Sequence, residues 1–247
     1  NALGSVGRNS ARGLLQAAEH FFCVNAGQLE AARAFYPDLG TERGVTGASV
    51  LPMGVAKLTP LAASDIRCEI GTMGRLSAKK GLDLLIRALE KLTADGTTPR
   101  VEIAGDGEDR AALMREVDKA DIGFPGFLSG YEKEAFLASC ARFAFPAKAR
   151  GGDVEGLPVA LLESLMRGQP VLASRDTNIE MLPEWDAIKD DIVFVPDPEN
   201  IEDLAQGLKE LLSRPPGSAG KAADILARYK WENLIEEYLN PIERATG

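Results

Sequence analysis

The chain has 247 residues, of which 45% are apolar and 26% charged, a balance that is ordinary for a globular protein with one large domain or one and a half smaller ones. Its formal net charge of −9 argues against extensive nucleic-acid binding, which needs a basic surface, but leaves room for a local basic pocket. No run of residues approaches the apolar length of a membrane-spanning helix, so we expect neither a membrane span nor a signal peptide.

Residues 1–60 are the least regular part of the sequence. The spacing of apolar residues predicts a helix over 11–20, a strand over 21–25 and a second helix over 28–35. Several glycines, Gly47 among them, then predict loops, and a short apolar segment at 50–55 ends in a turn. The chain begins with asparagine rather than methionine, and it reads like a piece of a longer protein.

From about residue 66, apolar runs alternate with amphipathic stretches. Six strand–helix units in succession predict an α/β fold, a Rossmann-like open parallel sheet with helices on both faces. Right-handed crossovers would place every strand-to-helix loop along one edge of that sheet. The predicted strands span 69–73, 101–104, 122–127, 143–145, 171–173 and 192–195. The predicted helices span 81–92, 109–117, 131–139, 159–166, 178–185 and 201–212.

The sequence also marks where some helices begin. Ser129 followed by Glu132 has the spacing of a capping box at the start of the third helix. The segment 215–220, rich in proline and glycine, predicts a break. A last helix then begins within 229–232, the tetrapeptide YKWE.

The cysteines and the single histidine show no metal or catalytic pattern. Cys23, Cys68 and Cys140 are far apart in the sequence, without metal-binding spacing or a disulfide framework, which favours a reducing cytoplasm. His20 precedes a predicted strand, with no visible partners for base or metal chemistry. We therefore expect His20 to be structural or simply exposed.

The first three strand-to-helix loops each have a glycine-bearing segment in or before them. In the first, MGRLSAKKG, Gly74 lets the backbone approach a ligand while Arg75 and Lys80 supply two cations, although such charges are also ordinary in a surface loop. The second, AGDGE, lacks the third glycine of a dinucleotide fingerprint because Arg110 stands in its place, so a dehydrogenase is disfavoured. The third follows the segment GFPGFL at 123–128.

The fourth loop and the helix after it form the most informative stretch, FPAKARGGDVEGLPVALLESLMRGQPVLAS. Pro158 and Gly168 fit the start and end of a helix, so Glu155 lies in the loop and Glu163 lies within the helix. The amides at such a helix start favour an anion. Glu163 shares a helix face with apolar residues, so it needs a partner such as an arginine, or it lies at the edge of the apolar stripe and faces solvent.

This stretch resembles the signature of retaining glycosyltransferases of the GT-B architecture, family 4. The match is a Glu, seven residues, a second Glu, and then a small residue, Gly-x-Pro-Val and a strand. The form GGDVEGLPV is most similar to members that build bacterial surface polysaccharides. The GRL-x-x-x-KG loop and the YKWE start of the last helix also resemble this family, so the similarity covers about residues 50–240.

The resemblance implies a role for each motif. Glu155 would contact sugar hydroxyls of a nucleotide-sugar donor, such as a UDP- or GDP-sugar, and Glu163 would hold the ribose. Arg75, Lys80 and the helix amides near Leu157 would stabilise the diphosphate without a metal, and no further cofactor is implied. The catalytic candidates are thus Arg75, Lys80 and Glu155. The donor-binding candidates are Gly74, Gly105, Gly126, Phe127, Gly156, Leu157, Pro158 and Glu163, although Phe127 could equally belong to the core.

The resemblance also divides the chain into parts. It implies a remnant of an N-terminal acceptor domain with its linker at 1–58, a nucleotide-sugar-binding domain at 59–229, and a helix at 230–247 that crosses back toward the N-terminal domain. A saccharide or lipid-linked acceptor would bind the N-terminal domain, most of which is absent here, so we expect the isolated chain to be inactive as a hexosyltransferase. Peripheral contact with the inner face of a membrane fits a lipid-linked acceptor.

Two alternatives stay open, and one departure from the family is visible. A nucleotide-sugar epimerase on the same scaffold would normally show more titratable groups than this chain does, and a nucleotide-binding module without chemistry would share the donor site. The family usually has a glycine-rich turn after the strand that ends at Ser174. Here the turn is 175–178, RDTN, with Glu180 following, so no ligand contact is carried over to it.

Overall fold

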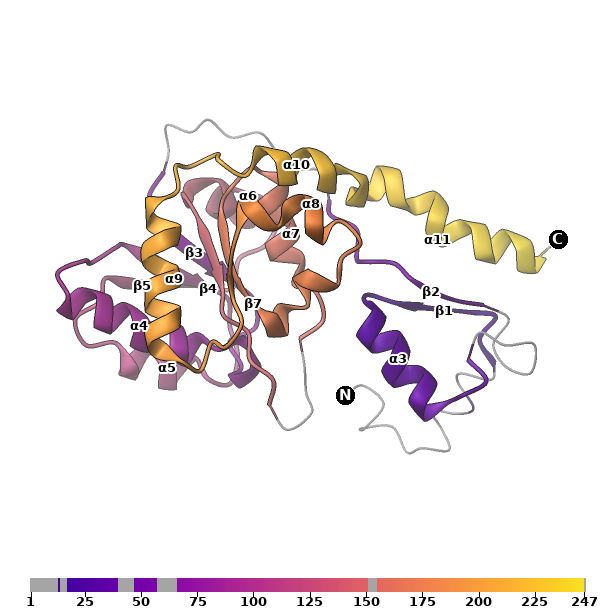
Figure 1. Ribbon diagram of the computed structural model, residues 1–247, viewed down its shortest axis with the longest axis horizontal. Helices are drawn as coiled ribbons and strands as arrows, with labels where there is room; N and C mark the ends of the chain where they lie inside the picture. Colours follow the sequence, from indigo (N-terminus) through magenta and orange to yellow (C-terminus); the bar gives the residue numbers. More distant parts are fainter. Residues whose placement is uncertain (1–12, 14–16, 40–46, 57–65, 151–154, 247) are drawn as a thin grey trace. The chain divides into compact units, whose positions relative to one another are not determined.

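The structure, a computed structural model, describes residues 13, 17–39, 47–56, 66–150 and 155–246 (Figure 1). The chain divides into two units, one formed by residues 1–56 with 228–247 and the other by residues 57–227. The second unit contains the six predicted strands and the strand-to-helix loops that follow them. The first contains a small two-stranded sheet and the last helix.

The larger unit is built on a six-stranded sheet whose paired strands all run parallel. Its strands are β3 (Ile70–Met73), β4 (Val101–Ala104), β5 (Ile122–Gly126), β6 (Phe143–Phe145), β7 (Val171–Ser174) and β8 (Ile192–Val195). The strand order is β5-β4-β3-β6-β7-β8, so the direction of winding reverses between β3 and β6. This arrangement confirms the predicted fold class. In such sheets ligands bind outside the carboxyl ends of the strands, at the point of reversal.

Helices cover the two faces of this sheet (Figure 1). One group packs around α4, and its apolar side chains form a continuous core with β3, β4, β7 and β8. The other group packs around α7 and α10. The first group is α4 (Leu82–Ala94), α5 (Arg110–Glu116) and α9 (Ile201–Ser213). The second is α6 (Gly130–Ser139), α7 (Val159–Met166), α8 (Trp185–Ile188) and α10 (Gly220–Leu226), the last of which the sequence did not predict.

The predicted helix at 178–185 is wrong. Two short 3₁₀ turns, Arg175–Thr177 and Ile179–Met181, occupy this region, and only the single turn of α8 follows. Asn178 adopts a left-handed conformation with φ 58°, and Pro183 disfavours helical geometry in the residue before it. These two constraints override an apolar spacing that is otherwise compatible with a helix.

The capping box predicted at the start of α6 is also wrong. Ser129 is the N-cap residue, but its side chain makes no capping hydrogen bond. The residue after it, Gly130, has φ 51°, which is not the helical geometry that a capping box needs at that position. The spacing of Ser129 and Glu132 was therefore coincidental.

The smaller unit pairs β1 (His20–Cys23) with β2 (Gly47–Val50) in parallel, with α3 (Ala26–Phe35) between them in sequence. Gly47 therefore begins a strand instead of a loop, and a Cβ atom there would lie 2.3 Å from the His20 ring. His20 is the first residue of β1. Its ring forms a hydrogen bond of 2.8 Å with the Ser49 hydroxyl, and the centroids of the His20 and Phe22 rings lie 4.5 Å apart. Burial lowers the pKa of His20. The histidine is structural, and half of the helix predicted at 11–20 lies outside the described residues.

The last helix, α11 (Trp231–Thr246), begins where the YKWE tetrapeptide predicted a helix start. Its first turn joins the segment after β2, because the Trp231 N–H donates to the carbonyl of Val55 at 3.0 Å. The Tyr238 hydroxyl reinforces this contact by donating to the carbonyls of Leu51, at 3.2 Å, and Pro52, at 3.0 Å.

Candidate functional site

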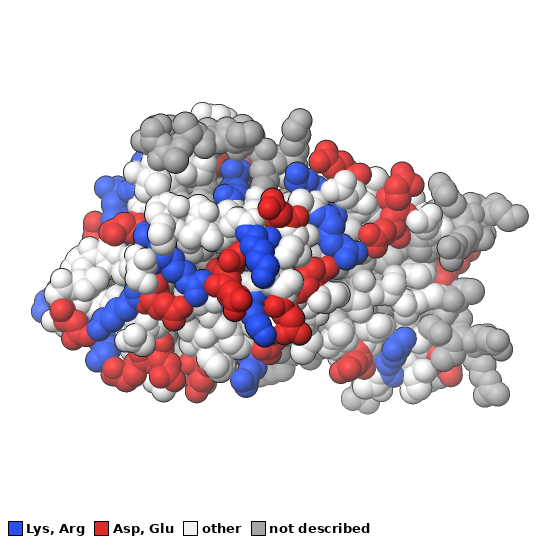
Figure 2. Space-filling view, turned by 45° about the horizontal axis from the view of Figure 1, so that its top comes forward, with Lys and Arg blue, Asp and Glu red and all other residues white. Residues whose placement is uncertain are grey.

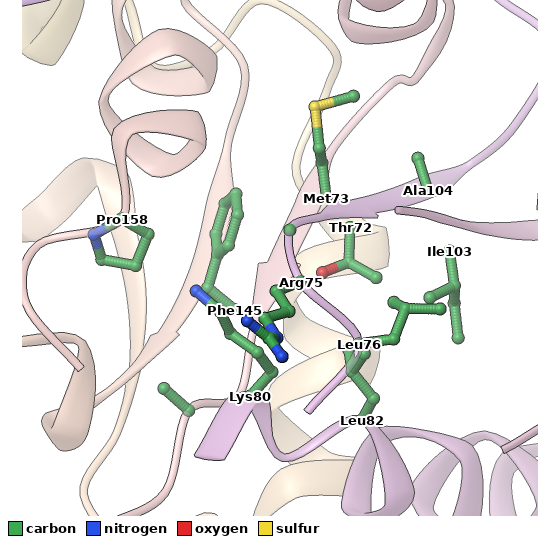
Figure 3. Close-up of a pocket in the computed structure, with 12 residues that line it drawn as sticks. Thr72, Met73, Arg75, Leu76, Lys80, Leu82, Ile103, Ala104, Phe145 and Pro158 are labelled. Atoms are coloured by element: carbon green, nitrogen blue, oxygen red, sulfur yellow. The ribbon is translucent and has the colours of Figure 1, made fainter. Parts of the chain in front are cut away.

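A hollow lies where β3, β4 and β6 end, at the point where the strand order reverses. Figure 3 shows its lining, which includes Met73 from β3, Ala104 from β4, Phe145 from β6 and Pro158 at the start of α7. Lys80 reaches it from the loop after β3. The predicted edge-of-sheet position of the motifs thus corresponds to a real depression in the described part of the chain.

Glycines allow the loops around this hollow to touch backbone to backbone. The Gly74 N–H donates to the Ala104 carbonyl at 3.1 Å, and the Gly105 N–H donates to the Gly126 carbonyl at 2.7 Å. A Cβ atom on Gly105 would lie 1.8 Å from the Gly74 carbonyl oxygen, so no other residue fits there without movement of the backbone. These three predicted glycines therefore build the shape of the site by bringing neighbouring loops together.

Two of the predicted catalytic residues form an ion pair. Lys80 Nζ lies 2.9 Å from Glu155 Oε1, and their side chains are 19% and 12% exposed. The turn after Lys80 is held against the end of β6 by Gly81, which has φ 64° and where a Cβ atom would lie 1.9 Å from the Pro146 carbonyl oxygen. The other carboxylate oxygen, Glu155 Oε2, is buried and has no hydrogen-bond partner among the described residues. One acceptor of Glu155 is thus left unused by the described residues.

Glu163 has the same arrangement in the middle of α7. Its carboxylate is 2% exposed, Oε1 lies 2.5 Å from Lys133 Nζ of α6, and Oε2 is buried without a partner in the described ranges. The partner is therefore a lysine and not an arginine, and the carboxylate does not face solvent. Lys133 was not found in the sequence, because nothing in the pattern of α6 shows which neighbour it meets.

Arg75 and Phe127, two of the predicted site residues, have side chains that are mostly exposed to solvent. The Arg75 side chain is 73% exposed and pairs at 3.0 Å with Glu108 of the loop after β4. The backbone N–H of Glu108 and then the Arg75 guanidinium lower the pKa of the Glu108 carboxyl. Phe127 is 75% exposed, so the alternative that it belongs to the core is wrong. Of these two exposed side chains, Arg75 lines the hollow.

A partly buried ion pair that the sequence did not reveal supports the loop after β6. Lys148 is 3% exposed, and its Nζ lies 2.5 Å from Asp83 in the first turn of α4. Its backbone N–H donates to the Lys79 carbonyl at 2.9 Å. The beginning of the loop that carries Glu155 is thus fixed to the start of α4.

The turn after β7 also holds this loop. Asn178 Nδ2 donates to the carbonyl of Glu155 at 2.6 Å and to that of Gly156 at 3.3 Å. Asp176 accepts a hydrogen bond from the Ala149 N–H at 2.5 Å. A turn without the expected glycines therefore contacts both described ends of the loop; residues 151–154 lie outside the described residues.

Three further features of the described residues concern metal ligands, helix hydrophobicity and surface charge. Within the described ranges, no three His, Cys, Asp or Glu side chains come together as they would around a metal ion. No helix in the described part combines the length and apolar character needed to cross a bilayer. On the face drawn in Figure 2, acidic and basic side chains are interspersed, without a broad basic patch among the residues shown in colour.

Two of the cysteines that are distant in the sequence are neighbours at the opposite edge of the sheet. Cys68 and Cys140 form a parallel β-bridge, and their Sγ atoms lie 2.6 Å apart as buried free thiols. The hydrogen bond from Cys68 and then burial raise the pKa of the Cys140 thiol. Neither residue reaches the hollow, which opens at the carboxyl ends of the strands.

Comparison with known proteins places these motifs in context. Residues 64–229 match the family model described as glycosyl transferases group 1. The chain is 33% identical over 132 residues to the putative colanic acid biosynthesis glycosyltransferase WcaL of Escherichia coli, a match covering 51% of this chain and 32% of WcaL. It is 30% identical over 192 residues to the GDP-mannose-dependent monoacylated alpha-(1-6)-phosphatidylinositol monomannoside mannosyltransferase of Corynebacterium glutamicum, covering 74% of this chain and 49% of that protein.

A solved structure extends the similarity to the fold. The Anabaena protein HepE, crystallised in complex with UDP, superposes with a TM-score of 0.66 at 15% identity, over 98% of this chain and 69% of HepE. At that identity the likeness concerns the fold alone. The chain spans about a third to a half of the length of the two curated relatives above.

Proposed function

The chain belongs to the glycosyl transferases group 1 family, and on this premise we propose that it is the donor-binding part of a retaining glycosyltransferase of the GT-B type. The observation that carries the proposal is the pair of carboxylates at α7. Glu155 and Glu163 each use one oxygen for a lysine and leave the other buried and without a partner in the described structure. A buried acceptor without a donor is costly, so such a pair fits a ligand that supplies hydroxyl donors.

The two carboxylates suit the two hydroxyl-bearing rings that flank the diphosphate of a nucleotide sugar, the transferred sugar and the ribose. We assign Glu155, in the loop at the hollow, to hydroxyls of the transferred sugar, and Glu163, within α7, to the ribose. A carboxylate accepts hydrogen bonds from vicinal hydroxyls with either oxygen. The two residues are eight positions apart, with Glu155 in the loop before α7 and Glu163 within the helix, so they would hold different parts of one ligand.

The positive groups of the site suit the diphosphate between these ends. The bond between the anomeric carbon and the terminal phosphate oxygen breaks during transfer, and the nucleoside diphosphate leaves with additional negative charge. Lys80 lies at the hollow, Arg75 lies at its rim, and α7 begins beside Leu157 and Pro158. A fixed cation and the amides of a helix start stabilise charge where it develops.

The acceptor and the place of reaction are part of the same proposal. WcaL and the mannosyltransferase are named for roles in colanic acid biosynthesis and in mannosylation of phosphatidylinositol mannosides, which supports a saccharide or a lipid-linked acceptor. We expect the acceptor to bind residues outside this chain, so that the chain alone binds donor without transferring sugar. A lipid-linked acceptor would place the reaction at the cytoplasmic face of a membrane.

Calorimetric titration with UDP, GDP and ADP, in buffer containing EDTA, tests the donor site. We expect one of these nucleotides to bind without added metal. Lys80→Met and Glu163→Gln should each weaken that binding about tenfold, because each removes one charge-assisted contact. The matched controls are Lys209→Met on α9, where the lysine pairs with Asp95, and Glu116→Gln at the exposed end of α5.

The outcomes separate the proposal from its alternatives. If folded protein binds none of the three nucleotides, or if Lys80→Met and Glu163→Gln bind as well as their controls, the donor-site assignment is wrong. If a longer form of the protein binds the nucleotide but neither transfers nor epimerises the sugar, the chain is a binding module.

A further inference from the structure

Asn178 combines an unusual backbone conformation with a fixed side-chain direction. It is the only non-glycine residue with positive φ in the described part of the chain, at φ 58° and ψ 20°. Asparagine enters this left-handed region more readily than most side chains. Its N–H donates to the Arg175 carbonyl at 2.9 Å, and its carbonyl accepts from the Met181 N–H at 3.0 Å. The two 3₁₀ turns on either side thus hold its backbone in place.

The Asn178 amide bridges to the loop that carries Glu155. Nδ2 donates to the Glu155 carbonyl at 2.6 Å and to the Gly156 carbonyl at 3.3 Å. The Glu155 side chain is held at its other end by Lys80, 2.9 Å away. Glu155 is therefore anchored by its backbone to the turn after β7 and by its carboxylate to the loop after β3. These two anchors set the direction of its buried, unpartnered Oε2.

Few residue types could meet both requirements at position 178. Glycine would accept the left-handed backbone but offers no donor to the two carbonyls. Aspartate would accept the backbone too, but it would place a carboxylate against two carbonyl oxygens. Alanine would lack the donor and strain the backbone. The chemistry of an asparagine amide, a donor on a short side chain, fits both.

From this geometry we infer that Asn178 is a positioning residue for Glu155, and that the turn after β7 thereby controls how the sugar end of the donor is held. The inference rests on the proposed function. Asn178 acts through the backbone of Glu155 and not by contact with the ligand. Its loss should therefore change recognition of the sugar and leave the nucleoside diphosphate, held by Lys80 and Glu163, largely unaffected.

The test compares nucleoside diphosphates with their sugar derivatives. Dissociation constants are measured for GDP and GDP-mannose, and for UDP and UDP-glucose, with the unmodified chain and with Asn178→Gly, Asn178→Asp and Glu155→Gln. In Asn178→Gly, which keeps the backbone conformation, the diphosphate alone should bind within about twofold of normal. The ratio of sugar-donor to diphosphate dissociation constants should rise about fivefold, the effect of one lost hydrogen bond. Asn178→Asp should raise it at least as much.

A double variant makes the test specific to Glu155. If Asn178 acts through Glu155, adding Asn178→Gly to Glu155→Gln should change the ratio no further, because the two effects share one path. If Asn178 had a merely structural role, Asn178→Gly would weaken the binding of GDP and of GDP-mannose by equal factors. Its effect on these affinities would also add to the effect of Glu155→Gln. Either result overturns the inference. An unchanged ratio in a folded Asn178→Gly variant also overturns it. If the unmodified chain binds no nucleotide, the proposed function itself fails, and the inference fails with it.

Discussion

The layer between α4, α9 and the sheet differs sharply from the carboxyl edge where β3 and β6 end, although both are buried. In the layer, Leu85, Leu89 and Leu208 are fully buried among other apolar side chains. At the edge, Glu163 and Lys148 are nearly as buried, at 2% and 3% exposed, yet they are charged. The layer buries apolar side chains, whereas the edge buries charged side chains.

The difference is consistent with a layer that maintains the fold and an edge that we propose holds a ligand. Burial of apolar surface is favourable by itself, whereas a buried ion needs a partner, and even a paired ion seldom adds much to stability. The edge keeps two carboxylate oxygens, Glu155 Oε2 and Glu163 Oε2, without partners in the described structure. Such an arrangement is hard to explain by stability, and it is consistent with the donor site proposed above.

The largest effect on stability is expected from breaking the apolar layer. Leu85→Ala in α4 should lower the free energy of unfolding by about 3 kcal/mol, because it leaves a cavity at a fully buried site. Urea denaturation followed by circular dichroism measures the change, and Met114→Ala, at a position 46% exposed on α5, is the control. The folded variant should bind nucleotide normally. A matching loss of nucleotide affinity at low temperature would show that the two regions are not separable.

At the carboxyl edge, the ion pair between Lys133 and Glu163 can be removed by substitution of Lys133. Lys133→Met should lower the free energy of unfolding by up to about 3 kcal/mol, because it leaves the buried Glu163 carboxylate without its counter-ion. Adding Glu163→Gln should restore part of that loss, since the unpaired charge is then gone. The same urea denaturation measures both variants. A double variant less stable than Lys133→Met would mean that the charge of Glu163 is not the source of the cost.

A smaller and pH-dependent effect is expected at the rim of the apolar layer. Burial raises the pKa of the Glu90 carboxyl, but backbone N–H groups of Asp118, Ala120 and Lys119 outweigh it, so the net pKa is lowered from its usual 4.5. Because the pKa of Glu90 is lower in the folded state, its carboxylate stabilises the fold at pH values above the unfolded-state pKa. This stabilisation is lost as the pH falls through the folded-state pKa.

Glu90→Gln should therefore lower the melting temperature at pH 7 and have a smaller effect near pH 3. Glu116→Gln, at an exposed end of α5, serves as the control. Thermal unfolding followed by circular dichroism at both pH values checks the prediction. If the melting temperature fell equally at the two pH values, the effect would come from altered packing and not from the charge of Glu90.

The sequence determined much of the larger unit, because its elements are short and clearly bounded. The strands Val101–Ala104 and Ile192–Val195 and the helix Val159–Met166 were predicted with their observed ends. Apolar runs between glycines and prolines leave little freedom for such boundaries. Since a parallel sheet joined by right-handed crossovers gathers its loops at one edge, the sequence also predicted that the loops carrying Lys80 and Glu155 would lie along the same edge.

Only the tertiary structure decided which side chains contact one another at that edge. The partner of Glu163, Lys133, is 30 residues away in sequence, and Asn178 is 23 residues from Glu155. Cys68 and Cys140 are separated by 72 residues and are nonetheless neighbours. Local periodicity specifies helices and strands, but contacts between them depend on strand order and packing. That is why the motifs could be read from the sequence, while the residues that hold them in place could not.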